Sequence, residues 1–153
     1  MAFVSAIDVI GSGFTAQQER LDVISENIVN MNTTRTENGE GPYRRKVVVF
    51  QADGGERFRD VLARTRYGRG GRVTSEAQGG VRVVEVAEDP SDFKLKYDPD
   101  DPDANEDGYV EMPNVDLVKE ITDGMAASQA WSANISAFNL LKSIISKGLE
   151  IGK

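Results

Sequence analysis

The residues most suited to chemistry form an acidic run at positions 98–108. An EF-hand calcium loop takes its ligands at fixed positions, and its positions 1, 3, 5 and 6 are matched by Asp103, Asn105, Asp107 and Gly108. Position 12 of such a loop should be a bidentate glutamate, but here it is Asn114, and no helical pattern precedes the run. We therefore expect a solvated turn that leads into a short strand at residues 109–112.

A glycine- and arginine-rich stretch at residues 68–72 could cradle a phosphate or bind RNA. It lacks the Lys-Ser/Thr pair of a P-loop and the helix start that such a loop needs, so we predict a hairpin tip. Two carboxylates could in principle hydrolyse a glycosidic bond. No apolar surroundings that would raise the pKa of one of them can be identified in the sequence.

Composition narrows the chemistry further. The chain has 153 residues with no Cys and no His, which excludes thiol nucleophiles, Ser-His-Asp triads and thiolate or imidazole metal sites. Its 18 basic and 25 acidic residues leave a net charge of −7, which argues against nucleic acid as a partner. We predict no catalytic residue, no cofactor and no metal.

The N-terminal segment has a helical period over residues 3–31. Apolar residues follow alternating steps of four and three, the seam pattern of a coiled coil, and they are Phe3, Ile7, Ile10, Phe14, Leu21, Ile24, Ile28 and Met31. Gln17 interrupts the seam, and Gly11 and Gly13 weaken the helix by roughly 1 kcal/mol each relative to Ala. Asn30 and Asn32 mark its end.

The C-terminal segment predicts a second helix over residues 115–149, with Asn114 as its N-cap and Asp116 in its first turn. Its stripe consists of Ile121, Gly124, Ser128, Trp131, Ile135, Phe138, Ile145 and Leu149, widened by Val118, Met125 and Leu141. The two stripes could form the core of an antiparallel helix pair. Each is wider than one partner requires, however, and large exposed apolar patches indicate association.

We therefore predict that the helices complete their burial against other subunits. The predicted interface residues are Ile7, Ile10, Phe14, Gln17, Leu21, Ile24, Asn27, Ile28, Met125, Trp131, Asn134, Ile135, Phe138 and Ile145. The asparagines Asn27, Asn30, Asn134 and Asn139 are poor helix formers, so they either cap the helices or make hydrogen bonds that fix register across an interface.

The middle of the chain is rich in β-formers and glycine. Residues 44–50 and 81–86 read as strands, residues 58–62 as a short strand or a helical turn, and glycines divide the rest into loops. We predict an α+β fold: long N- and C-terminal helices form a coiled-coil-like layer, with a small loop-rich β domain inserted between them. The domain boundaries are 1–34 with 113–153 for the helices and 35–112 for the β domain, whose segment 53–78 is variable.

Charge is segregated within this middle region. Residues 35–72 carry ten basic side chains against five acidic ones, a net charge of +5, whereas residues 73–112 carry three against twelve, a net charge of −9. Such blocks are either solvated faces or complementary surfaces through which one subunit orients the next.

The chain shows no membrane-spanning stretch and no charged n-region, so we expect any export to proceed without a cleaved signal peptide. A membrane-surface role for the N-terminal helix is disfavoured, because its acidic side chains outnumber Arg20 and anionic lipid would repel them. A small β-domain enzyme or a carbohydrate-binding protein acting on peptidoglycan is a further alternative. The absence of His and of an acid pair argues against it.

Residues 15–30 (TAQQERLDVISENIVN) resemble the N-terminal signature of flagellar rod, hook and hook-associated proteins. Gly41-Pro42-Tyr43-Arg44-Arg45-Lys46 and residues 107–116 (DGYVEMPNVD), with the short length and the C-terminal residues 147–153, narrow the resemblance to the proximal rod members of this axial family. Residues 53–78 align poorly.

The resemblance implies a non-enzymatic structural subunit of the flagellar basal-body rod that helps to form the drive shaft. Its terminal helices would form an inner layer around the export channel, with the middle domain outside. It implies passage through the flagellar type III export apparatus and assembly in the periplasm. The implied partners are further copies of the chain, the rod proteins FlgB, FlgF and FlgG, the adaptor FliE and the ring components around the rod.

Overall fold

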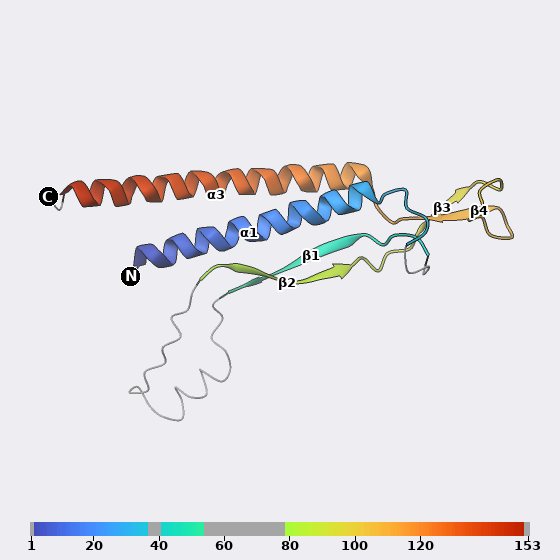
Figure 1. Ribbon diagram of the computed structural model, residues 1–153, viewed down its shortest axis with the longest axis horizontal. Coiled ribbons are helices and arrows are strands. Elements are labelled where there is room, and N and C mark those ends of the chain that lie inside the picture. The colour runs from blue at the N-terminus through green and yellow to red at the C-terminus, as the bar shows by residue number, and fades with distance from the viewer. Residues whose placement is uncertain (1, 37–40, 54–78, 152–153) are drawn as a thin grey trace, which may run out of the picture.

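Two long helices dominate the architecture in the computed structural model, which describes residues 2–36, 41–53 and 79–151. Helix α1 spans Ala2–Val29 and helix α3 spans Leu117–Ile151. They pack antiparallel, with the end of α1 beside the start of α3 (Figure 1). The predicted α+β class with a long helix at each end of the chain is confirmed, and the helix bounds agree with the prediction to within two residues.

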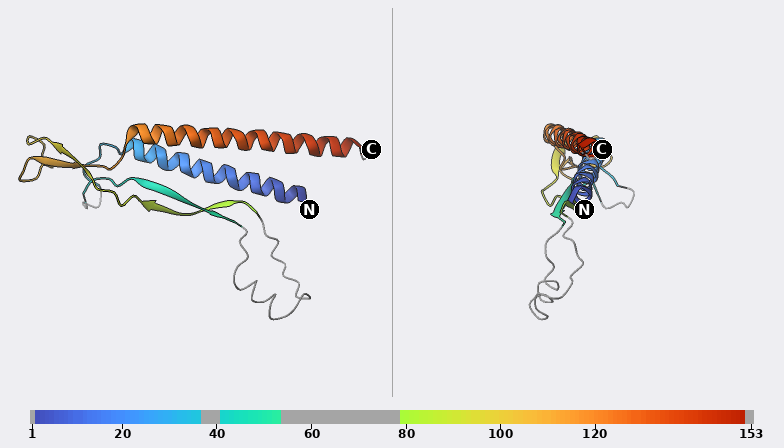
Figure 2. Two further views of the ribbon diagram at one scale, coloured as in Figure 1. Left: turned by 180° about the vertical axis from the view of Figure 1, so that it is seen from behind. Right: turned by 90° about the vertical axis from the view of Figure 1, so that its left-hand side faces the viewer.

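A first β-ribbon lies along α1. Strand β1 (Lys46–Ala52) pairs antiparallel with strand β2 (Val81–Glu88), and a bulge between Val49 and Phe50 shifts the register. Both strands contact α1, and the ribbon lies on the side of α1 that faces away from α3 (Figures 1 and 2). Helix α1 is therefore the middle one of three layers, covered by α3 on one side and by the ribbon on the other.

The open end of this ribbon is attached to the first half of α1 through Ser12. The Ser12 hydroxyl donates a hydrogen bond to the carbonyl of Val9 (2.7 Å) and accepts one from the backbone N–H of Val81 (3.1 Å). Gly80 has a φ of +145°, and a Cβ built on it would lie 2.6 Å from Ser12 Oγ. Only glycine fits here, because both the backbone conformation and the close approach exclude a side chain.

A second ribbon projects beyond the end of the helix pair (Figure 1). It pairs β3 (Lys94–Tyr97) with β4 (Tyr109–Met112), and it forms a sheet separate from that of β1 and β2. The strand predicted at residues 109–112 is confirmed. Strand β3 was not expected, because it has only four residues and two of them are lysines. The predicted domain boundaries remain a prediction.

The buried apolar core is small. Among the described residues, its members are Ala16, Ile24, Tyr43, Val110, Val115 and Ala127. Exposed large apolar side chains far outnumber them and occur on α3 and on both ribbons. Burial within one chain therefore satisfies only part of the apolar surface that the sequence provides.

The start of α3 differs from the prediction in its capping residue. The Asp116 carboxylate accepts a hydrogen bond from the backbone N–H of Val118 (3.0 Å), so Asp116 is the N-cap. The prediction of Asn114 in that role was wrong, because the Asn114 side chain bonds instead to the loop at Ser91 and to Arg45. At the end of α1, the Asn30 amide donates to the carbonyl of Glu26 (3.0 Å), a local capping bond.

Two sequence predictions fall outside the described residues: the short element at 58–62 and the hairpin tip at 68–72. In the part of the chain that the structure describes, no helix combines the length and apolar character needed to cross a membrane.

Candidate subunit interface

The contact between α1 and α3 uses small side chains to bring the helices together. Ala16 and Ala127 are almost fully buried, and a Cβ built on Gly124 would lie 3.7 Å from Ile24 Cγ2. Further along, a Cβ built on Gly13 would lie 2.9 Å from Asn134 Nδ2. Glycine in these helices therefore provides the space for close packing, which offsets its low helix propensity.

One aromatic pair marks the middle of the helix contact. The rings of Phe14 and Trp131 meet edge to face, with their centroids 5.6 Å apart and an interplanar angle of 74°. This is a favourable geometry for two aromatic rings. Trp131 is nevertheless 37% exposed, so the pair, although midway along the helices, lies at the solvent-facing side of their contact and leaves apolar surface open.

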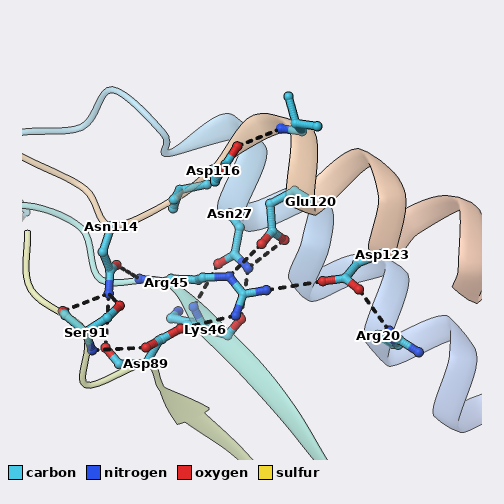
Figure 3. A network of polar contacts seen from close by, with 12 residues as sticks. Arg20, Asn27, Arg45, Lys46, Asp89, Ser91, Asn114, Asp116, Glu120 and Asp123 are labelled. Atoms are coloured by element: carbon cyan, nitrogen blue, oxygen red, sulfur yellow. Dashed lines mark hydrogen bonds and ion pairs between the residues drawn. The ribbon is translucent and has the colours of Figure 1, made fainter. Parts of the chain in front are cut away.

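At the other end of the contact, Asn27 connects three segments of the chain (Figure 3). Its amide donates to the carbonyl of Lys46 (2.9 Å) and to the carboxylate of Glu120 (3.1 Å). Its oxygen accepts from the Tyr43 hydroxyl and from the backbone N–H of Lys46, both at 2.9 Å. All the hydrogen-bonding positions of this side chain are thus used within the chain, as its 1% exposure requires.

Arg45 lies beside Asn27 and faces three carboxylates. Its Nε donates to Glu120 at 2.6 Å, and its two terminal nitrogens reach Asp89 at 3.3 Å and Asp123 at 3.4 Å. Glu120 is 0% exposed, so its charge is tolerable only because Arg45 and Asn27 both donate to it.

Asn114 joins this network to the loop before β3. Its oxygen accepts from the backbone N–H of Arg45 (2.7 Å), and its amide donates to the carbonyls of Asp89 and Ser91 at 3.1 Å each. We call Asn27, Tyr43, Arg45, Asn114 and Glu120 the polar junction. It holds both helices, the start of β1 and the loop after β2 at one end of the molecule.

Ionisation equilibria reflect this arrangement. Burial raises the pKa of the Tyr43 hydroxyl, and the charges of Glu26 and Glu120 raise it further. Burial opposes the charge of Arg45, but its hydrogen bond and charge interaction with Glu120 outweigh this effect and raise the pKa of the guanidinium. Hydrogen bonds from Ser91 lower the pKa of Asp89, and Arg45 lowers it further.

The polar junction as a buried network was not predicted from the sequence. Of its members, only Asn27 was expected to make specific hydrogen bonds, and these were expected at an interface between subunits. One signal was available: Glu120 lies four residues before Gly124 and seven before Ala127, on the same helix face that packs against α1. An acidic residue on such a face requires a buried cation. Which cation serves could not be deduced, because Arg45 is 75 residues away in the chain.

The predicted interface residues divide into two groups. Ile24 and Asn27 are buried within the chain, so neither offers surface to another subunit in this structure. The others remain partly or largely exposed, and they are Ile7, Ile10, Phe14, Gln17, Leu21, Ile28, Met125, Trp131, Asn134, Ile135, Phe138 and Ile145. Gln17 Oε1 is a special case, since it is buried without a hydrogen-bond partner among the residues that the structure describes.

Exposed apolar side chains also lie on the side of α3 that faces away from α1, in one group near its start and one towards its end. We call this side the outer face of α3 and define it by Val118, Ile121 and Met125 in the first group and Leu140 and Ile144 in the second. Val118 is 73% exposed, Met125 61% and Leu140 63%. Residues 124–141 contain no charged side chain, although α3 is open to solvent on this side.

The acidic run forms turns that lead into β4, as predicted. Asp103 accepts hydrogen bonds from Thr34 (2.9 Å) and Arg35, and the Asn105 oxygen accepts from the backbone N–H groups of Asp107 and Tyr109. Side chains that an EF-hand would direct at calcium thus hold the loop itself. Within residues 2–36, 41–53 and 79–151, no group of three or more acidic side chains gathers in a way that could hold a metal ion.

Comparison with known proteins finds flagellar rod proteins, the family that the sequence motifs resemble. Residues 7–35 match the family model described as "Flagella basal body rod protein", and residues 106–151 match "Flagellar basal body rod FlgEFG protein C-terminal". The flagellar basal-body rod protein FlgC of Bacillus subtilis is 46% identical, with 100% of both chains covered. FlgC of Borreliella burgdorferi is 40% identical over 99% of this chain and 98% of its own, and FlgC of Salmonella typhimurium is 37% identical over 100% of both.

These matches extend over the whole chain, from the N-terminal helix to the C-terminal helix. The chain therefore belongs to the FlgC family of flagellar basal-body rod proteins.

Proposed function

We propose that the chain is a structural, non-enzymatic subunit of the flagellar basal-body rod, and that its terminal helices assemble with those of neighbouring subunits around the export channel. Family membership supports the first part, because the relatives are named as rod proteins. The second part is supported by the amount of apolar helix surface that one chain leaves open.

The observation that carries the proposal is the outer face of α3. A helix that lies on the surface of a monomer normally carries charged residues on its solvent side, but here residues 124–141 have none. Each large apolar side chain on this face gains roughly 1.5–3 kcal/mol when it is buried, before the entropy of ordering is subtracted. Neighbouring helices are the natural partners, because an uncharged helix face with small side chains between two apolar groups can pack closely along another helix.

The half-buried residues between α1 and α3 belong to the same proposed surface. Phe14 and Trp131 contact each other across the two helices, and Trp131 and Phe138 each remain more than one third exposed, so one further helix could cover them. In this arrangement the polar junction sets the position of the two helices, and the seam residues beyond it complete their packing against other subunits.

The partners of this assembly follow from the same proposal. They are further copies of the chain, the rod proteins FlgB, FlgF and FlgG, the adaptor FliE, and the ring components around the rod. The subunit reaches the periplasm through the flagellar type III export apparatus without a cleaved signal peptide, and it remains in the basal body.

The test is Met125→Asp, which places a charge among the exposed apolar side chains near the start of α3. Because Met125 is 61% exposed, the monomer should fold normally, whereas burial of an uncompensated carboxylate between subunits would cost several kcal/mol. We expect normal expression and export, no completed rods in purified basal bodies, and loss of swimming. Leu21→Asp and Ile135→Asp should have the same effect, but these residues are half-buried in the helix pair, so their variants would also disturb the monomer.

Two matched variants control for the substitution. Met125→Leu keeps an apolar side chain of similar volume and should swim normally. Lys119→Asp adds an acid to the exposed first turn of α3, about 100° around the helix from Val118, and should also assemble. Swimming of the Met125→Asp strain at the wild-type rate would contradict the proposal.

A further inference from the structure

The β3–β4 hairpin presents an apolar face that nothing in the described part of the chain covers. Leu95 pairs with Glu111 and Tyr97 with Tyr109, so these four side chains share one face of the ribbon. Leu95 is 64% exposed, Tyr97 is 65% exposed, and the Tyr97 and Tyr109 rings meet edge to face with centroids 5.2 Å apart. The opposite face contains Val110, which is fully buried.

The hairpin that carries this apolar face is strongly acidic. Residues 95–111 carry seven acidic residues against a single lysine, a net charge of −6. Asp98 pairs with Lys96 and Asp103 with Arg35. The exposed carboxylates of Asp100, Glu106, Asp107 and Glu111 form no ion pair with any residue that the structure describes.

A groove of about 380 Å³ lies at the edge of this face. Its lining includes Tyr109 and Glu111 of β4, the charged side chains of Asp103 and Arg35, and the apolar rings of Pro42 and Pro102. A carboxylate next to an aromatic ring is a good environment for a guanidinium group, which can pair with the former and stack on the latter. The surface therefore fits an arginine-rich segment that also carries aromatic side chains.

The chain itself contains such a segment. Residues 57–72 carry six arginines and one aspartate, a net charge of +5, together with Phe58 and Tyr67. The segment starts from the open end of the β1–β2 ribbon, where the backbone N–H of Asp53 donates to the carbonyl of Gly80 (2.8 Å) and Ser12 of α1 lies alongside. The β3–β4 hairpin lies beyond the opposite end of α1 (Figure 1), and α1 rises about 25 Å between Ser12 and Val29.

We propose that the outward face of the β3–β4 hairpin docks the basic segment 57–72 of a second copy of this chain. The segment joins the described part of the chain at the open end of the β1–β2 ribbon, and the hairpin lies beyond the opposite end of α1, so the contact joins copies end to end. Unlike a two-fold contact, such a heterologous contact leaves one unused surface at each end and can be repeated. It is separate from the terminal helices on which the proposed function rests.

Cysteine crosslinking tests the proposal directly, because the chain has no cysteine of its own. A double variant, Glu106→Cys with Arg66→Cys, is expressed in place of the wild-type chain, and purified basal bodies are treated with a short bismaleimide. An end-to-end contact should produce a ladder of products whose masses are multiples of the 16.7 kDa chain. The matched control is Glu85→Cys with Arg66→Cys, in which the second cysteine lies on β2, and it should give no ladder.

Charge reversal then asks whether the two surfaces recognise each other. Adding Asp107→Lys and Glu111→Lys to the crosslinking variant should reduce the ladder by about tenfold, since like charges would meet across the contact. Adding Arg64→Glu and Arg69→Glu as well should restore it. Reversal of Glu85 and Glu88, two exposed acids on β2, is the matched control and should leave the yield unchanged.

Three outcomes would overturn the proposal. A crosslinked product of single-chain mass would show that the segment docks on its own hairpin. A product whose mass is no multiple of the chain would identify another protein as the occupant. Absence of any crosslink in basal bodies from swimming cells would show that the surfaces do not meet. None of these outcomes depends on Met125→Asp, so failure here is distinguishable from failure of the proposed function.

Discussion

Replacement of Arg45 by methionine should destabilise the monomer more than any other single change in the polar junction. The change keeps a flexible, unbranched stem but removes the cation 2.6 Å from the Glu120 carboxylate. Glu120 is 0% exposed and would keep only the Asn27 amide as a donor. Removal of one partner from a buried ion pair costs about 3–5 kcal/mol. A domain of this size has about 5–15 kcal/mol in total, so we expect the variant to be close to unfolding.

Urea unfolding measures this loss with two probes that report on different places. Far-UV circular dichroism follows the two long helices, and fluorescence follows the single tryptophan, Trp131, which contacts Phe14 in the middle of the helix pair. Coincident transitions would justify a two-state free energy of unfolding. The expected result for Arg45→Met is a large decrease in the urea midpoint with a similar slope.

Two further variants decide whether the buried charge is the cause. Arg20→Met breaks a pair with Asp123 that is 3.4 Å long and about one third exposed on both sides, which should cost no more than about 1 kcal/mol. Arg45→Met with Glu120→Leu removes both charges and should recover most of the loss, apart from about 1 kcal/mol for the unpaired Asn27 amide. The reasoning is refuted if Arg45→Met costs no more than Arg20→Met, or if the double variant is as unstable as the single one.

Three smaller predictions use the same unfolding assay. Gly11→Ala should stabilise the protein by up to about 1 kcal/mol, because a Cβ at this position meets nothing within 4 Å. Gly80→Ala should destabilise it, because a Cβ there would lie too close to Ser12. Equal effects of the two variants would contradict this close approach. Tyr43→Phe should lower the free energy of unfolding by about 0.5–1.5 kcal/mol. The pKa of the Tyr43 hydroxyl is raised above 10.0, so the stability that this hydroxyl contributes is complete below pH 10.0 and is lost as pH rises through the folded-state pKa. An alkaline absorbance titration should therefore show one tyrosine that ionises later than the others, and the variant should lack it. The pKa of Asp89 is lowered below 3.8, so Asp89→Asn should be less stable than the wild type above that pH. The difference in the free energy of unfolding should vanish as pH falls through the folded-state pKa. A difference that persists in strong acid would show that the Asp89 charge is not its cause.

The helices were predictable because their signal is long and periodic. The apolar steps of four and three from Ile7 to Ile28 repeat often enough to fix the element, its face and nearly its bounds. The strand at residues 109–112 was found for a related reason, since a turn ending in Gly108, with its φ of +79°, precedes it. Local patterns of this kind are visible without knowledge of the fold.

The polar junction could not be predicted in the same way, because its members interact over long sequence separations. Asn27 and Glu120 are 93 residues apart, and Arg45 and Asn114 are 69 apart. Asn114 illustrates the difficulty: its position before a helix made capping the natural interpretation, but the tertiary fold offered its side chain stronger partners. Local preference was overridden by contacts that only the complete chain can make.

The middle position of α1 has a mechanical consequence. Among the described elements, α1 contacts α3 and both strands of the first ribbon, whereas α3 packs along no element other than α1. Force applied at the C-terminus would therefore peel away one layer and leave α1 on its ribbon. Force applied at the N-terminus would withdraw the layer that the other two share, so that α3 and the ribbon would lose their apolar contacts together. A subunit built in this way loses a single layer when it is pulled from its C-terminus, but loses the contacts between all three layers when it is pulled from its N-terminus.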